Sequence, residues 1–165
     1  MEGTNDWGII FATFAGPIIA VQLQKFIEKA TEKIRNKTQL FHTLMATRAS
    51  RVSNEHVRAL NMIEIVFRGR TFLGLNHQFK KEKAVVEQWR LYLDALEERH
   101  DNSKESLERI NKKWDDQFIE LMFAMSNALG FDFDKVQLKK SIYTPKAHGD
   151  AENAQMQMRD GLLKI

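Results

Sequence analysis

The feature that most constrains this chain is an uncharged run over residues 7–23, WGIIFATFAGPIIAVQL, near its start. As a helix, the run would be about 25 Å long, close to the shortest segment that crosses a hydrocarbon core of about 30 Å. It is apolar on every side, whereas a helix on a protein core or flat on a membrane needs only one apolar stripe. We therefore predict a tip and a single transmembrane anchor in residues 1–24, and one helical domain in residues 25–165. A buried hairpin or core helix is the competing interpretation.

The charges on either side of the run predict its orientation. Glu2 and Asp6 precede it, and Lys25, Lys29 and Lys33 follow it. A secretory signal peptide carries its positive charges before the apolar region, so cleavage is not expected here. Because positive residues stay on the cytoplasmic side, we expect a single pass through the membrane, with the N-terminus outside and the body in the cytoplasm.

Small residues recur at every fourth position of the run, a spacing that lets two helices approach closely in lipid. They are Gly8, Ala12, Gly16 and Ala20. A heptad pattern then continues past the run and is interrupted only by Lys37: Ala20, Leu23, Ile27, Ala30, Ile34, Phe41 and Leu44. We predict self-association through the small residues, and a helical stalk of about forty residues along the heptad pattern.

Composition favours an all-α fold, because the 165 residues include only two Pro and eight Gly. The lack of Cys excludes disulfides, thiolate metal sites and a cysteine nucleophile. Residues 25–83 carry thirteen Lys and Arg against five Asp and Glu, a balance of +8, whereas residues 84–165 carry twelve against fifteen, or −3. Anionic lipid attracts a basic segment beside a membrane. Nucleic acid is not expected as a partner, because aromatic residues do not interleave with the basic ones.

Apolar periodicity predicts the helices of the body. A helix capped by Ser53 runs to Phe67, a second covers about 79–99, and a third starts at a capping box of Asn102 and Glu105 and stops at Gly130. The last two should form an antiparallel hairpin, since the turn between them is short. A brief helix or turn with Asp132 or Asp134 as its N-cap and a terminal helix over 150–163 complete the bundle. The expected inward faces are Val57, Leu60, Ile63 and Phe67; Val85, Val86, Trp89, Leu93 and Leu96; and Leu107, Ile110, Trp114, Phe118, Leu121, Met122, Met125 and Leu129.

No catalytic signature is present in the sequence, so an enzyme is not the favoured interpretation. We predict no catalytic residue, no metal site and no cofactor. Glu97 and His100 have the spacing of one half of a di-iron ligand pair, but the second copy that such a site requires is missing. Phosphate-binding loops, dinucleotide-binding glycines and nucleophile elbows are likewise missing from the sequence.

Two polar clusters remain as candidate ligand-binding residues. The first is Arg48, Arg51, Asn54, His56 and Arg58, and the second is Tyr143, Lys146, His148 and Asp150. The first could hold an anion at the start of the second helix, where free amide groups favour negative charge. If the clusters meet, they form either a binding pocket or a structural clamp between an Arg and Asp150, and the sequence leaves both open.

Three stretches resemble a family of small bacterial and phage-associated proteins of unknown function. They are MATRASRVSNEHVRALNMIEIVF, VEQWRLYL and NALGFDFDKVQLKKSIYTPKAHGD, and the resemblance covers nearly the whole chain. It implies a prokaryotic setting, a hydrophobic N-terminus and a helical body, and it brings no activity or catalytic residues with it.

The favoured function is therefore a membrane-anchored helical scaffold that self-associates or holds a partner protein, with a phage or host-defence role as one setting. The alternative is an anion-binding or nucleotide-phosphate-binding module, or a hydrolytic one, that uses the two polar clusters. An oligomeric pore-forming effector ranks lowest, because the anchor carries no charge to line a conduit.

Overall fold

The computed structural model describes residues 6–72, 75–99 and 103–140, and for 6–14, 70–72 and 75–77 it gives the backbone alone. This part of the chain holds five helices and one short hairpin in the order α1, α2, β1, β2, α3, α4, α5. The all-α class is thus confirmed, although the hairpin was not predicted. The predicted terminal helix over 150–163 lies outside the described residues.

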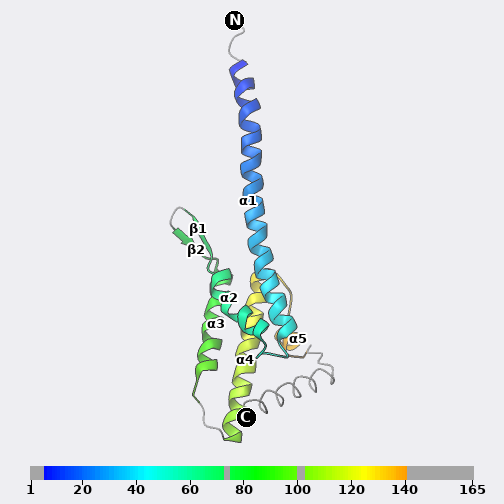
Figure 1. The fold of residues 1–165 in the computed structure, drawn as a ribbon, viewed down its shortest axis with the longest axis vertical. Coiled ribbons are helices and arrows are strands. Elements are labelled where there is room, and N and C mark those ends of the chain that lie inside the picture. The colour runs from blue at the N-terminus through cyan, green and yellow to red at the C-terminus, as the bar shows by residue number, and fades with distance from the viewer. Residues whose placement is uncertain (1–5, 73–74, 100–102, 141–165) are drawn as a thin grey trace, which may run out of the picture.

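Helix α1, Asp6–Thr47, is a single helix of 42 residues that continues through Pro17. Its first half stands clear of the other described elements, and only its last turns join the body (Figure 1). Every residue from 16 to 36 is exposed except Ala30, which is half-buried. The long stalk predicted from the heptad pattern is therefore confirmed as a helix.

The anchor prediction can be judged only in part, because for residues 7–14 of the run the side chains lie outside the described part of the structure. Among the described residues, no helix has a stretch that is both long and apolar enough to cross a membrane.

Helix α2, Asn54–Val66, begins at Ser53, whose hydroxyl accepts a hydrogen bond from the amide of His56 at 3.3 Å, as the sequence predicted. Beyond α2, Gly69 adopts a φ of 94°, which favours glycine, and redirects the chain. Strands β1, Arg70–Phe72, and β2, Leu75–His77, then pair antiparallel with Thr71 opposite Asn76.

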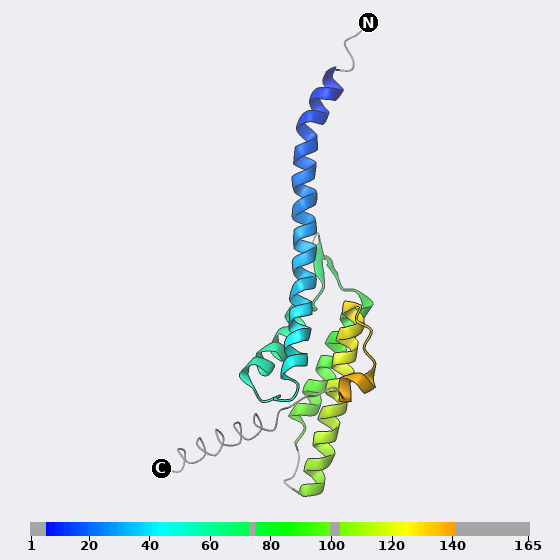
Figure 2. The same ribbon diagram turned by 90° about the vertical axis from the view of Figure 1, so that its right-hand side faces the viewer.

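Helices α3, Lys80–Glu97, and α4, Lys104–Leu129, pack side by side and antiparallel, which confirms the predicted hairpin (Figure 2). Helix α4 ends at Gly130, which has a φ of 80°. Its N-cap is Ser103, whose hydroxyl accepts from the Ser106 amide at 3.3 Å. The predicted capping box at Asn102 and Glu105 is therefore wrong, since the cap lies one residue later.

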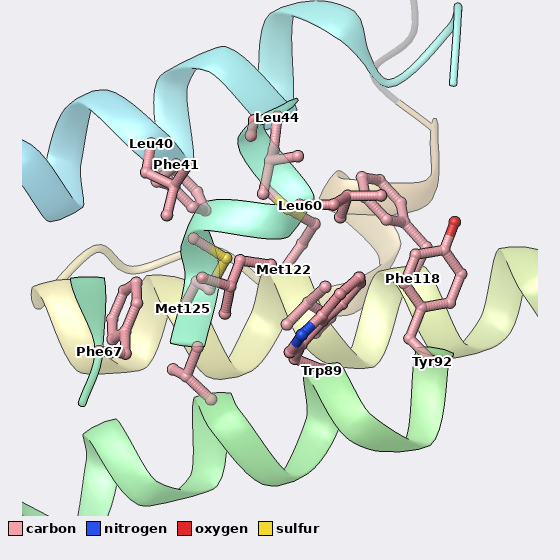
Figure 3. Packing of buried hydrophobic residues seen from close by; sticks show 14 of the residues in the cluster. Leu40, Phe41, Leu44, Leu60, Phe67, Trp89, Tyr92, Phe118, Met122 and Met125 are labelled. Atoms are coloured by element: carbon pink, nitrogen blue, oxygen red, sulfur yellow. The ribbon is translucent and has the colours of Figure 1, made fainter. Parts of the chain in front are cut away.

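The core lies where the last turns of α1 and all of α2 cover the α3–α4 pair (Figure 3). Its buried members are Leu40, Phe41, Leu44, Ala59, Leu60, Ile63, Phe67, Val85, Trp89, Tyr92, Phe118, Leu121, Met122, Met125 and Leu138. Val57 is 44% exposed, so its predicted inward position is wrong, and His56 takes the buried position on that face of α2.

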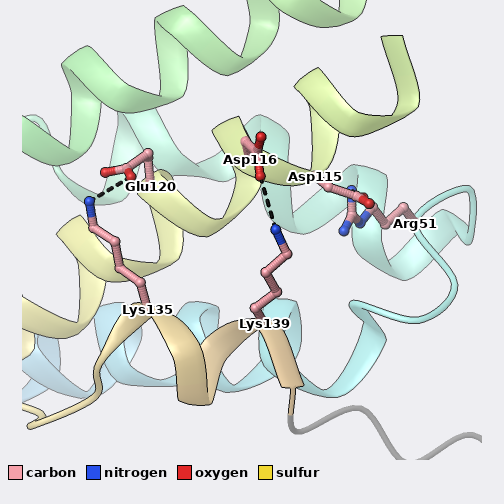
Figure 4. Close-up of polar contacts among 6 residues, drawn as sticks. All are labelled: Arg51, Asp115, Asp116, Glu120, Lys135 and Lys139. Carbon is pink, nitrogen blue, oxygen red and sulfur yellow. Dashed lines mark hydrogen bonds and ion pairs between the residues drawn. The ribbon is translucent and has the colours of Figure 1, made fainter. Parts of the chain in front are cut away.

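Helix α5, Lys135–Lys140, closes the side of the body formed by α4 and the end of α1. The carboxylate of Asp134 accepts from the Gln137 amide at 2.6 Å, which confirms this residue as the cap. Leu138 is buried, and Lys135 and Lys139 pair with Glu120 and Asp116 of α4 at 2.6 and 3.3 Å (Figure 4). Because all four charged groups are exposed, these pairs orient α5 more than they stabilise it.

Candidate functional site

The first predicted cluster lies at the corner where α1 passes into α2. Arg48, Arg51 and His56 come together here, and their polar atoms point toward other parts of the protein. Asn54 and Arg58 are exposed on the other side of α2. The structure therefore divides the cluster into an inward-facing set and an outward-facing set.

His56 is completely buried and is held by the last residue of α1. Its Nδ1 lies 2.7 Å from the hydroxyl oxygen of Thr47. That hydroxyl also donates its only proton to the carbonyl of Thr43, at 2.8 Å. It follows that Thr47 accepts from His56, so the proton of the neutral imidazole is on Nδ1. Nε2 then carries a lone pair, and it has no hydrogen-bond partner among the described residues.

This environment holds His56 in its neutral form. Burial, and secondarily the nearby Arg51 guanidinium, lowers the pKa of His56 from 6.5 to about 4. A second proton would have to go to the buried Nε2, where a positive charge is poorly solvated. His56 is therefore a poor anion ligand near neutral pH.

Arg51 bridges the corner to α4. Its Nη1 lies 2.8 Å from Oδ1 of Asp115 (Figure 4). Its guanidinium lies 4.6 Å from the centre of the Phe118 ring. Its Nε donates to the carbonyl of Arg48 at 3.4 Å. Burial raises the pKa of Tyr92, and Arg51 opposes that rise. The cation is thus shared between a carboxylate, a carbonyl and aromatic groups.

Arg48 is directed toward α5. Its Nη1 donates to the carbonyl of Leu138 at 3.3 Å, close to the C-terminal end of α5. A cation at this end of a helix is favourable, because the last carbonyls there lack helical partners. Arg48 and Arg51 together therefore tie the α1–α2 corner to the two helices behind it.

The outward-facing residues belong to a groove of about 630 Å³ between α1 and α2. Its lining residues are Asn36, Gln39, Leu40, Thr43, Asn54, Glu55, Arg58, Ala59, Met62 and Val66. Arg58 is the one cation in this lining, and Glu55 contributes the opposite charge.

The structure describes only some of the other predicted site residues. Tyr143, Lys146, His148 and Asp150 lie outside the described residues, so ligand binding by the second cluster stays a prediction. The side chain of Ala12 is also outside them, and for Gly8 only the helical backbone is described. Gly16 and Ala20 are exposed, and a Cβ added at Gly16 would meet nothing within 4 Å.

Two residues of the corner, Tyr92 and Asp115, were missed by sequence reasoning, and neither is near the cluster in sequence. Tyr92 and Asp115 reach it through the packing of α3 and α4, and a regular pattern of apolar residues does not indicate such long-range partners. Across the residues with described side chains, no group of three or more His, Asp or Glu side chains is arranged to hold a metal ion.

The sequence matches a family of unknown function, DUF6680, over residues 2–165. The chain belongs to the DUF6680 family. The match confirms the resemblance to a family of unknown function, and it assigns this DUF6680 member no activity. Comparisons with curated proteins and with solved structures found no match.

Proposed function

We propose that this chain is a membrane-anchored scaffold, in which the start of α1 lies in a bacterial inner membrane and the stalk presents the helical body to a partner in the cytoplasm. The observation that carries the proposal is the exposed apolar surface of α1 above the body. Ile18, Ile19 and Val21 are 62%, 65% and 48% exposed. Large apolar patches left open in one chain mark a surface that something else covers.

Lipid fits the first part of this surface because residues 7–23 contain no charge, whereas charged residues begin at Lys25. The exposed residues Ile18, Ile19 and Val21 are distributed around the helix, as lipid contact requires. The basic residues that follow would lie beside anionic head groups, which attract them by about 1 kcal/mol each.

A scaffold is favoured over an enzyme by the way the polar corner is used. Arg51 is paired with Asp115, Arg48 bonds the end of α5, and His56 is buried and neutral. These groups stabilise the body and offer no nucleophile or acid–base pair to a substrate.

Liposome flotation of the full chain tests the proposal. The wild type should float with the vesicles and resist an alkaline wash. The double variant Ile18→Asp/Ile19→Asp should be extracted, because each carboxylate in a spanning helix costs about 2.5–3.5 kcal/mol. The matched control is Thr31→Asp/Asn36→Asp, which adds the same charge to exposed positions of the stalk. Equal extraction of both variants, or of the wild type, would contradict the anchor.

Anion binding in the α1–α2 groove is a second candidate, favoured by the exposed Arg58 beside the start of α2. A phosphate-binding groove predicts that inorganic phosphate raises the melting temperature of the wild type and that Arg58→Ala removes the rise. Without that rise, the groove is not a phosphate site.

A further inference from the structure

The apolar surface of α1 extends beyond the part that lipid can cover. Ile27 and Ile34 are 55% and 58% exposed, and Ala30 between them is half-buried. They lie among charged residues, including Glu28, Lys29, Glu32 and Lys33. Because charged side chains are expensive inside a bilayer, this part of the stalk is in water and its apolar stripe needs a protein partner.

The stripe has the spacing of a coiled coil and ends where the body begins. Its five positions alternate steps of three and four residues: Ala20, Leu23, Ile27, Ala30 and Ile34. The next position is Lys37, which pairs with Glu82 of α3, and the following one is Phe41, which is buried in the core. Therefore, on the C-terminal side of Ile34 the heptad positions pack against the body of the same chain. From Ala20 to Ile34 they have no packing partner among the described residues.

We propose that residues 20–34 of α1 form a parallel two-stranded coiled coil with a second copy of this chain. In heptad terms, Ala20, Ile27 and Ile34 occupy a positions, and Leu23 and Ala30 occupy d positions. Ile at a with Leu at d favours two parallel strands over three or four. The parallel direction also rests on the proposed function, because two copies anchored in one membrane point the same way.

The residues flanking the seam are compatible with this pairing. In a parallel pair, each g residue faces the e residue five positions later in the partner helix. Phe26 would then face Thr31, and Lys33 would face Thr38. No like charges oppose each other across the seam, so identical chains can pair without repulsion. Below Ile34 the two helices separate, since each joins its own body.

Single-cysteine crosslinking of the full chain tests the pairing directly, because the sequence contains no Cys. Ile27→Cys places a thiol in the seam, and Glu32→Cys places one on the opposite, exposed face as the matched control. Under mild oxidation in detergent or liposomes, Ile27→Cys should form a covalent dimer at least tenfold faster than Glu32→Cys. Equal rates, or no dimer from Ile27→Cys, would overturn the proposal.

A mixture of two further variants tests the direction. Leu23→Cys and Ile34→Cys should each crosslink to themselves and not to each other in the parallel arrangement. A crosslink between them would indicate antiparallel helices and would overturn the parallel arrangement.

The mass of the wild type in detergent, after subtraction of bound detergent, should be that of two chains, and the mass of one chain would contradict the coiled coil. Flotation of the same variants separates the two proposals, since an anchored chain that does not crosslink refutes only the coiled coil.

Discussion

The hydroxyl oxygen of Thr47, the last residue of α1, lies 2.7 Å from Nδ1 of the buried His56 in the first turn of α2. This contact joins the stalk helix to the body at the point where the chain reverses. Thr47→Val keeps the shape of the side chain and removes the acceptor, which leaves the Nδ1 proton of His56 buried without a partner. We expect a loss of about 1–3 kcal/mol of unfolding free energy. Urea unfolding followed by circular dichroism measures it, and a change below about 0.5 kcal/mol, as is usual for a surface substitution, would contradict the assigned bond.

The neutral state of His56 predicts a stability that depends on pH. Its pKa is 6.5 when unfolded and about 4 when folded, so the unfolded chain takes up the proton first as the pH falls. Stability contributed by the neutral ring is fully present above pH 6.5 and is lost as the pH falls toward 4, by about 3 kcal/mol at most.

The variant His56→Gln isolates this effect, because Gln does not titrate. The difference in unfolding free energy between wild type and variant should shrink or change sign as the pH falls from about 7 to about 5. Parallel pH profiles for the two proteins would show that His56 is not neutral and buried as described.

Arg51 should contribute more to stability than its ion pair alone. Asp115 is 58% exposed in its side chain, so Asp115→Asn should cost less than about 1 kcal/mol. Arg51→Ala also removes the guanidinium from the Phe118 ring and from the Arg48 carbonyl, and it should cost about 1–2 kcal/mol more. Equal losses for the two variants would mean that the ion pair dominates.

Glu82 makes two contacts that a substitution would remove. One oxygen pairs with Lys37 of α1, and the other accepts from the Phe79 amide at the start of α3, at 3.2 Å. Both side chains of the ion pair are largely buried. Glu82→Ala should therefore cost about 2–3 kcal/mol, since it removes a cap and leaves a half-buried ammonium unpaired. Glu87→Ala, on the exposed side of the same helix, serves as the control and should cost less than about 0.5 kcal/mol.

Local signals predicted the ends of the helices well. Ser53, Gly130 and Asp134 were identified as caps because a cap depends on the few residues next to it. On the buried face of α2, Leu60, Ile63 and Phe67 were predicted correctly and Val57 was not, because the pattern was assigned from apolar residues alone and His56 was not counted among them.

Long-range pairing was harder to predict. A clamp between an Arg and Asp150 was one of two alternatives left open by the sequence, and Asp150 lies outside the described residues; the carboxylate that pairs with Arg51 in the described part is Asp115. Asp115 lies on a helix that packs behind the corner, and many exposed carboxylates on that helix have similar sequence surroundings. Only the packing of α4 against the corner selects one of them. The β1–β2 hairpin was missed for a related reason, since strands of three residues are too short to show an alternating pattern.

Cysteine accessibility in inverted inner-membrane vesicles tests whether the start of α1 lies in lipid. Ile18→Cys lies on the stalk helix away from the coiled-coil seam, so only lipid would protect it, and Thr31→Cys lies beyond the uncharged run. If the start of α1 lies in lipid, a membrane-impermeant maleimide should label Thr31→Cys in intact vesicles, but should label Ile18→Cys only after the chain is denatured in detergent. Rapid labelling of Ile18→Cys in intact vesicles, at the rate of Thr31→Cys, would contradict a location in lipid.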